Sequence, residues 1–162
     1  MMRDKLGLFG IDEKDKLLKA ANLINNSKKP VILAGHGILL SGASQEIIKL
    51  AEIASTPVTW TLLGSGGVPA SHPLNIGMMG MHGEYAVNNA IQEADLLIAC
   101  GMRFDDRVTG DISTYSLNSK KIHIDIDPSE MNKIIPVDVG IVCDLKNTVG
   151  ELLPLIQKKN NK

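Results

Sequence analysis

The chain has 162 residues, of which 44% are hydrophobic and 22% charged, and its formal net charge at pH 7 is −1. This length and balance are typical of one soluble globular domain with a proper core. The near-neutral charge and an aromatic content of 3% exclude the basic surface and the stacking platforms of nucleic-acid-binding proteins. Because no signal peptide or membrane-spanning apolar run is visible, we expect a cytoplasmic protein that binds neither nucleic acid nor membrane.

The first part of the chain alternates predicted helices and strands. After an irregular lead-in over residues 1–12, apolar residues recur at helical spacing over 13–26. The stretch "PVILAGHG" is then typical of a buried parallel strand that stops at Gly35. A second helix is predicted over 45–54, with Ser44 as its N-cap.

The alternation continues to the end of the chain. "TPVTWTLLG", ending at Gly64, and "NIGMMGMHG" predict a second and a short third strand, followed by a helix over about 84–93. "ADLLIACG", "KKIHIDID" and "VGIVCD" predict three more strands, and 145–157 predicts a closing helix. In "KKIHIDID", three isoleucines alternate with three polar residues, which places the two sets on opposite faces: Ile122, Ile124 and Ile126 on one, His123, Asp125 and Asp127 on the other.

This order predicts an α/β fold, a three-layer Rossmann-like domain with an about six-stranded parallel sheet and helices on both faces. We expect a single domain over residues 13–158, followed by a tail over 159–162. Ligands of such folds bind outside the carboxyl ends of the strands. Five segments converge on that edge, and four of them carry glycine: "AGHG", "WTLLG", "GMMGMHG", "CGMRFDD" and "DIDPSE".

The first glycine-rich segment resembles a dinucleotide fingerprint without matching it. Gly35 and Gly37 fit G-x-G-x-x-G, but the third glycine, Gly42, comes two residues late. Ser55 stands where the ribose-binding acid is expected. Glycines at this place still let the backbone approach a phosphate closely.

Several other classes of site are absent from the sequence. It has no phosphate loop of the G-x-x-x-x-G-K-[ST] type and no G-x-S-x-G nucleophile elbow. The histidines at 36, 72, 82 and 123 lack the spacing of zinc ligands. Both cysteines, Cys100 and Cys143, lie in or at the end of apolar runs and are expected to be buried free thiols. We therefore expect neither a metal site nor catalytic residues.

Two arginines flank a pair of carboxylates in "RFDDRVTG". Asp105 and Asp106 could bind Mg²⁺, but Arg103 and Arg107 compete with a cation for them. The cluster could also be a solvated ion-pair network that only holds the loop. Its place after a central strand favours a third interpretation, in which an arginine binds a phosphate and an aspartate supports it.

Two further segments at this edge leave alternatives open. Asp125 and Asp127 could accept hydrogen bonds from ribose hydroxyls or an adenine amino group, or could simply form a turn before Pro128. The methionines of "GMMGMHG" could fill the core, although their glycine-rich setting favours an apolar wall beside a flat ring.

On "GMMGMHG", "RFDDRVTG" and "HIDIDPSE", nearly the whole chain resembles the central domain of the acetolactate (acetohydroxyacid) synthase family of thiamine-diphosphate-dependent enzymes. Related pyruvate oxidase-like proteins share the architecture but usually lack the double aspartate flanked in this way. A stand-alone nucleotide-binding module without catalysis is the remaining alternative. Leu63, Met102 and Trp60 depart from the residues common in the family.

The resemblance implies that FAD binds along the carboxyl edge, in a mainly structural role. Carried over position by position, it implies these cofactor-binding residues: Gly35, His36 and Gly37 near the phosphates or ribityl chain; Thr61, Leu62, Leu63, Met79, Gly80, Met81, His82 and Gly83 around the flavin; Gly101, Arg103, Asp105, Arg107 and Val108 at the middle of the cofactor; and Asp125, Ile126, Glu130 and Asp144 near the adenosine.

For the full-length enzyme the resemblance implies condensation of pyruvate with a second 2-oxo acid, pyruvate or 2-oxobutanoate, in branched-chain amino-acid biosynthesis. It also implies thiamine diphosphate, Mg²⁺, flanking domains of the same polypeptide, a homo-oligomer and a small regulatory subunit. The Gly-Asp-Gly…Asn motif that holds thiamine diphosphate is absent from these 162 residues. We therefore expect the chain to be one domain of a three-domain enzyme and to be inactive alone.

Overall fold

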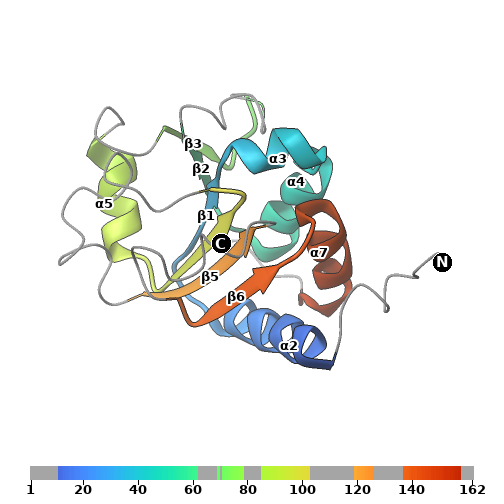
Figure 1. Cartoon of the computed structure of the whole chain (residues 1–162). Coiled ribbons are helices and arrows are strands. Elements are labelled where there is room, and N and C mark those ends of the chain that lie inside the picture. Colours follow the sequence, from blue (N-terminus) through green and yellow to red (C-terminus); the bar gives the residue numbers. More distant parts are fainter. Residues whose placement is uncertain are drawn as a thin grey trace.

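A parallel sheet forms the centre of the molecule. The computed structural model describes residues 11–61, 69, 71–78, 85–102, 119–125 and 137–157. Within these residues the sheet has six strands in the order β3-β2-β1-β4-β5-β6 (Figure 1). In chain order the strands are β1 Pro30–Ala34, β2 Val58–Trp60, β3 Asn75–Met78, β4 Leu96–Cys100, β5 Lys120–Asp125 and β6 Val139–Val142.

The two most apolar strands lie side by side in the middle of the sheet. β1 and β4 pair in parallel from Pro30↔Leu96 to Ala34↔Cys100, and every residue of both strands is buried. A strand buried on both faces needs a continuous apolar run rather than an alternating one. The runs "PVILA" and "LLIAC" therefore determine which strands occupy the centre.

Helices cover both faces of the sheet, as expected for a three-layer fold. α2 (Ile11–Asn26), α4 (Ser44–Ala54) and α7 (Leu145–Leu152) lie on one side, and α5 (Tyr85–Glu93) lies on the other (Figure 1). We call the side of α2, α4 and α7 the large-core face, and the side of α5 the small-core face. The described part of the chain also contains α3 (His36–Ser41) and a short 3₁₀ helix, η3 (Leu153–Leu155).

Successive residues along the central strands enter two separate cores. Ile32 and Ile98 belong to the cluster of the large-core face, whereas Leu33 and Leu97 belong to the cluster of the small-core face. This follows from the period of two along a strand. The alternation predicted for β5 is confirmed for the residues that the structure describes: Ile122 and Ile124 join the large core, and His123 contacts Met102 of the small core.

Two details of the β1–β2 connection differ from the sequence prediction. A short helix, α3, follows β1 directly and was not predicted. The predicted N-cap was also wrong: Ser44 is the first helical residue of α4, Ala43 precedes it, and no side chain caps the helix. The reason is that α3 ends at Gly42 in the left-handed conformation (φ 68°) and α4 begins almost at once, with Ile47 N donating to Ala43 O at 3.0 Å.

Two elements are shorter than predicted. β2 covers only Val58–Trp60, and the indole Nε1 of Trp60 donates to Asn75 Oδ1 at 2.8 Å, which links β2 to β3. The α-helical part of the closing helix ends at Leu152, and the chain tightens into η3, which contains Pro154. Proline has no N–H to continue the helical ladder.

None of the helices in the described part of the chain combines the length and the apolar character that crossing a membrane requires.

Candidate functional site at the carboxyl edge of the sheet

The strand order reverses direction between β1 and β4. From β1 the sheet continues through β2 to β3, and from β4 it continues through β5 to β6. In open parallel sheets such a switch point leaves a crevice outside the carboxyl ends of the strands, where ligands bind. β1 leaves the sheet at Gly35 and β4 leaves it at Gly101, so two glycines stand at this point.

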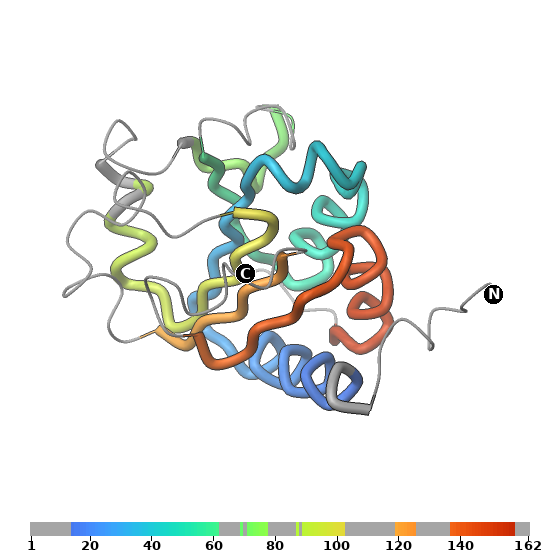
Figure 2. The backbone as a smooth tube through the Cα atoms, in the orientation of Figure 1, coloured from blue at the N-terminus to red at the C-terminus, as the bar shows by residue number. Residues whose placement is uncertain are grey.

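The two chain segments that leave the sheet here touch through their backbones. A Cβ on Gly37 would lie 2.7 Å from Gly101 Cα, and a Cβ on Gly101 would lie 2.7 Å from Gly37 Cα. A Cβ on Gly35 would overlap Gly101 O and Met102. Gly101 also has φ +63°, which favours glycine. We call the three residues Gly35, Gly37 and Gly101 the glycine contact. Figure 2 shows the end of β4 turning beside the start of α3.

This contact gives the glycines a reason that the sequence did not reveal. The expectation was that they let the backbone approach a phosphate. In the structure the space that their side chains would fill is occupied by the opposite backbone. Gly42, the late third glycine of the apparent fingerprint, serves a separate purpose, because it caps α3 in the left-handed conformation.

Backbone hydrogen bonds tie neighbouring strand ends together along this edge. Thr61 N donates to Ala34 O at 3.0 Å, which joins the ends of β2 and β1. Gly37 N donates to Gly101 O at 2.9 Å, and Gly101 N donates to Ile124 O at 2.9 Å. The edge is therefore continuous from β2 to β5.

Two of the predicted carboxylates lie on adjacent strand ends further along the edge. Asp125 ends β5, and its carbonyl accepts from Cys143 N at 3.0 Å, directly after β6. Asp144 comes next and is the N-cap of α7, with Oδ2 accepting from Asn147 N at 3.1 Å. Asp144 thus has a structural role, which the sequence analysis did not assign to it.

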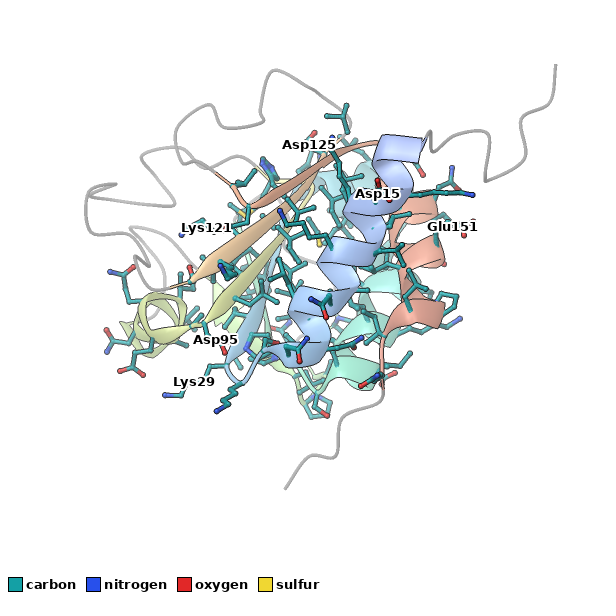
Figure 3. The ribbon with its side chains drawn as sticks, turned by 90° about the horizontal axis from the view of Figure 1, so that it is seen from below. Asp15, Lys29, Asp95, Lys121, Asp125 and Glu151 are labelled. Atoms are coloured by element: carbon teal, nitrogen blue, oxygen red, sulfur yellow. The ribbon has the colours of Figure 1, made fainter. Side chains whose placement is uncertain are left out.

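The sequence-predicted residues that the structure describes form one row. They lie at the carboxyl ends of β2, β1, β4, β5 and β6: Thr61, Gly35, His36, Gly37, Gly101, Asp125 and Asp144. Four strand spacings of about 4.8 Å make this row roughly 19 Å long. Figure 3 shows Asp125 at the other end of the sheet from Lys29 and Asp95. The row suits an extended ligand with acceptor carboxylates at one end.

The remaining predicted site residues lie outside the described part of the chain: Leu62, Leu63, Met79, Gly80, Met81, His82, Gly83, Arg103, Asp105, Arg107, Val108, Ile126 and Glu130. The assignments of these residues stay predictions. Among the described residues, no three His, Cys, Asp or Glu side chains gather in a way that could hold a metal ion.

Burial governs the titration of two groups in the sheet. Cys100, the last residue of β4, is buried, and desolvation raises the pKa of its thiol to about 12. Because the reactive form of cysteine is the thiolate, Cys100 is an inert core residue. Cys143, also predicted to be buried, is only partly so. At the start of β5, burial lowers the pKa of Lys121, and the nearby Asp138 opposes this shift.

Sequence reasoning missed a buried polar contact near this edge. His123 Nε2 lies 2.7 Å from Met102 O, and both residues are buried. The alternation in "KKIHIDID" indicated the face on which His123 lies, but nothing in the sequence indicated a partner 21 positions away.

Fold and site together define a doubly wound α/β domain whose candidate ligand site is the switch-point edge. Residues 17–152 match the family model described as "Thiamine pyrophosphate enzyme, central domain". This match covers most of the chain, and the chain belongs to that family.

Curated relatives agree with this assignment. The chain is 53% identical over 138 residues to the "Probable acetolactate synthase large subunit" of Methanocaldococcus jannaschii, covering 85% of this chain and 23% of the relative. It is 47% identical over 135 residues to the "Acetolactate synthase large subunit" of Corynebacterium glutamicum, covering 83% and 22%. The chain thus spans about a quarter of the length of these relatives.

A solved structure supports the fold. A protein from Mycobacterium smegmatis described as "a putative thiamin diphosphate-dependent enzyme" matches with a TM-score of 0.77 at 25% identity. The match covers 93% of this chain and 29% of that one. The predicted α/β class and six-stranded parallel sheet are therefore confirmed.

Proposed function

We propose that this chain is the FAD-binding central domain of an acetolactate synthase catalytic subunit. The observation that carries the proposal is the 53% identity, over 85% of the chain, to a relative whose name is that of this enzyme's large subunit. Identities of 40–48% to other relatives with corresponding names add to it. The whole protein condenses pyruvate with pyruvate or 2-oxobutanoate in branched-chain amino-acid biosynthesis.

Thiamine diphosphate and Mg²⁺ belong, in this proposal, to flanking domains of the same polypeptide. The printed sequence lacks the Gly-Asp-Gly…Asn motif, so this chain alone carries out no condensation. We also propose a cytoplasmic homo-oligomer that binds a small regulatory subunit. The double aspartate of "RFDDRVTG" weighs against a pyruvate oxidase-like protein, because such proteins usually lack two aspartates flanked in this way.

The described row of residues fits an extended dinucleotide such as FAD. The three residues of the glycine contact place no side chain of their own at the switch point, so these positions offer only backbone groups to a ligand. Asp125 and Asp144 provide carboxylate oxygens at the far end of the row, which can accept from ribose hydroxyls or an adenine amino group.

FAD serves here as a structural cofactor, since the condensation involves no net oxidation or reduction. The chain's own residues therefore need only to bind and orient it. Thr61 and the ends of β1 and β4 hold the flavin half and the middle of the cofactor, and the ends of β5 and β6 hold the adenosine. Arg103 and Arg107 contribute positive charge for the phosphates, and Asp105 orients them.

Titration of FAD against the purified chain, followed by flavin fluorescence, tests the proposal. We expect saturable binding that Arg103→Ala weakens by about tenfold or more, because a charge-assisted bond to phosphate is worth about 1.5–3 kcal/mol. Lys49→Ala is the matched control: it removes one positive charge from the exposed surface of α4 and should leave the affinity unchanged. Absence of FAD binding by the unmodified chain would overturn the FAD assignment, and equal affinity of Arg103→Ala would overturn the role of that arginine.

A further inference from the structure

A histidine lies completely buried in the small-core face of the sheet. His123 is the fourth residue of β5, and its exposed fraction is 0%. The strand residues around it on this face, such as Leu97 and Ala99 of β4, are apolar. Burial of an imidazole is costly unless its nitrogens are hydrogen-bonded, so its contacts indicate why the position is polar.

His123 contacts the backbone where β4 ends. His123 Nε2 lies 2.7 Å from Met102 O, and a carbonyl oxygen can only accept. Nε2 therefore carries a hydrogen and donates a hydrogen bond to Met102 O. The same nitrogen lies 3.8 Å from Oδ2 of Asp125, which is two residues further along β5 on the same face. His123 thus lies next to two groups at the candidate site, the carbonyl of Met102 and the carboxylate of Asp125.

Met102 belongs to the backbone that forms the switch point. The preceding carbonyl, Gly101 O, accepts from Gly37 N at 2.9 Å, and Gly101 has φ +63°. Two consecutive carbonyls therefore accept from two different elements, Gly101 O from Gly37 of α3 and Met102 O from His123 of β5. Glycine adopts this left-handed conformation without strain, so what the two bonds fix is the position of the segment that leaves β4.

We propose that His123 is a positioning residue: its hydrogen bond to Met102 O fixes the end of β4 so that the glycine contact has the shape that binds the cofactor. The inference rests on the proposed function for its ligand, FAD, but its structural half concerns the glycine contact alone. His123 does not touch the cofactor and takes no part in chemistry.

Three substitutions separate this role from simple packing. His123→Phe keeps an aromatic ring but removes the donor, and His123→Gln keeps an N–H donor at a similar reach. His123→Asn is polar but too short to reach Met102, and it replaces the Phe variant if that one fails to fold. Thr56→Val is the matched control, because Thr56 is also fully buried and its hydroxyl donates to Ala54 O at 3.0 Å. Thr56 lies just before β2, at the amino ends of the strands and therefore away from the candidate site.

Each variant is measured for thermal unfolding, for FAD affinity by flavin fluorescence, and for exchange of the Gly37 amide by NMR. We expect His123→Phe to weaken FAD binding by about tenfold and to speed Gly37 exchange by a similar factor, the size expected for one lost buried hydrogen bond. His123→Gln should restore both to within about threefold of the unmodified chain. Thr56→Val should lower the unfolding temperature while changing neither.

Two results would overturn the inference: His123→Phe behaving like Thr56→Val in both readouts, or His123→Gln failing to restore them. If the unmodified chain does not bind FAD, the proposed function fails for this chain, whereas Gly37 exchange still decides whether His123 positions the glycine contact.

Discussion

The two faces of the sheet differ in what their cores contain. On the large-core face, α2, α4 and α7 enclose aliphatic side chains from every central strand, including Ile32, Ile98 and Ile122. On the small-core face, α5 encloses a smaller apolar cluster, and β5 adds two buried polar side chains, Lys121 and His123. We infer from this difference that the two cores have different roles. The large core supplies most of the stability, and the small core holds the backbone of the candidate site in place.

The largest expected effect on stability lies at the glycine contact, at the carboxyl edge of the sheet between its two faces. Gly35→Ala should destabilise the chain by more than about 3 kcal/mol, because the new Cβ overlaps Gly101 O and Met102 and the backbone must shift. Thermal unfolding followed by circular dichroism measures this as a fall of roughly 6–12 °C.

The control for this substitution is Gly150→Ala within α7, where a Cβ meets no atom within 4 Å. Alanine is the better helix former, so this variant should gain about 0.5–1 kcal/mol. Equal unfolding temperatures for the two variants would show that the glycine contact is not closely packed.

A second pair of variants compares the two cores directly. Leu96 and Leu97 are adjacent in β4 and both essentially inaccessible, but Leu96 packs in the large core and Leu97 in the small core. Each Leu→Ala substitution should cost about 2–5 kcal/mol. Hydrogen exchange should distinguish them, because Leu97→Ala leaves a cavity in the cluster that includes Val87 and Ile91 of α5 and should speed exchange mainly in that helix.

Leu96→Ala should instead leave α5 protected relative to the rest of the chain. If both variants raise the amide exchange rate uniformly over all helices, the two cores behave as one cooperative unit and the inferred difference between their roles is wrong.

The smallest effect concerns the thiol in the large core. The pKa of Cys100 is raised by burial from 9.0 to about 12, so the unfolded thiol ionises at a lower pH than the folded one. The contribution of this group to stability is therefore complete below pH 9 and decreases as the pH rises toward 12, by up to about 1.4 kcal/mol per pH unit.

Urea unfolding of the unmodified chain and of Cys100→Ala between pH 8 and 11 measures this difference. The stability of the unmodified chain relative to the variant should stay constant to about pH 9 and then fall. A constant difference up to pH 11 would mean that water reaches this part of the large core.

Much of the fold was predictable because its signals are local. The continuous apolar runs of β1 and β4 predicted two strands buried on both faces, and the alternation in β5 predicted which side chains share a face. α3 was not predicted, because in the sequence Gly42 resembles part of a dinucleotide fingerprint as much as it resembles the end of a helix. Ser44 was wrong as the N-cap because α4 begins one residue earlier than predicted, with Ala43 directly after the Gly42 that ends α3.

The candidate site was predictable in part. Glycines and carboxylates after strands indicated the edge on which Gly35, Gly101 and Asp125 lie, because parallel strands bring their carboxyl ends together. The specific reasons for these residues were not predictable. Gly37 faces Gly101 across 64 positions of sequence, and Asp144 caps α7 as well as standing at the edge.

The sequence by itself thus determined the α/β class, the central strands, the ligand edge and the resemblance to the family, since each depends on hydrophobic period or on contiguous motifs. Only the tertiary structure decided which backbones touch at the switch point and that His123 donates to Met102. Such contacts join segments that are distant in the chain, and their geometry is set by strand order, by register and by the packing of two unequal cores.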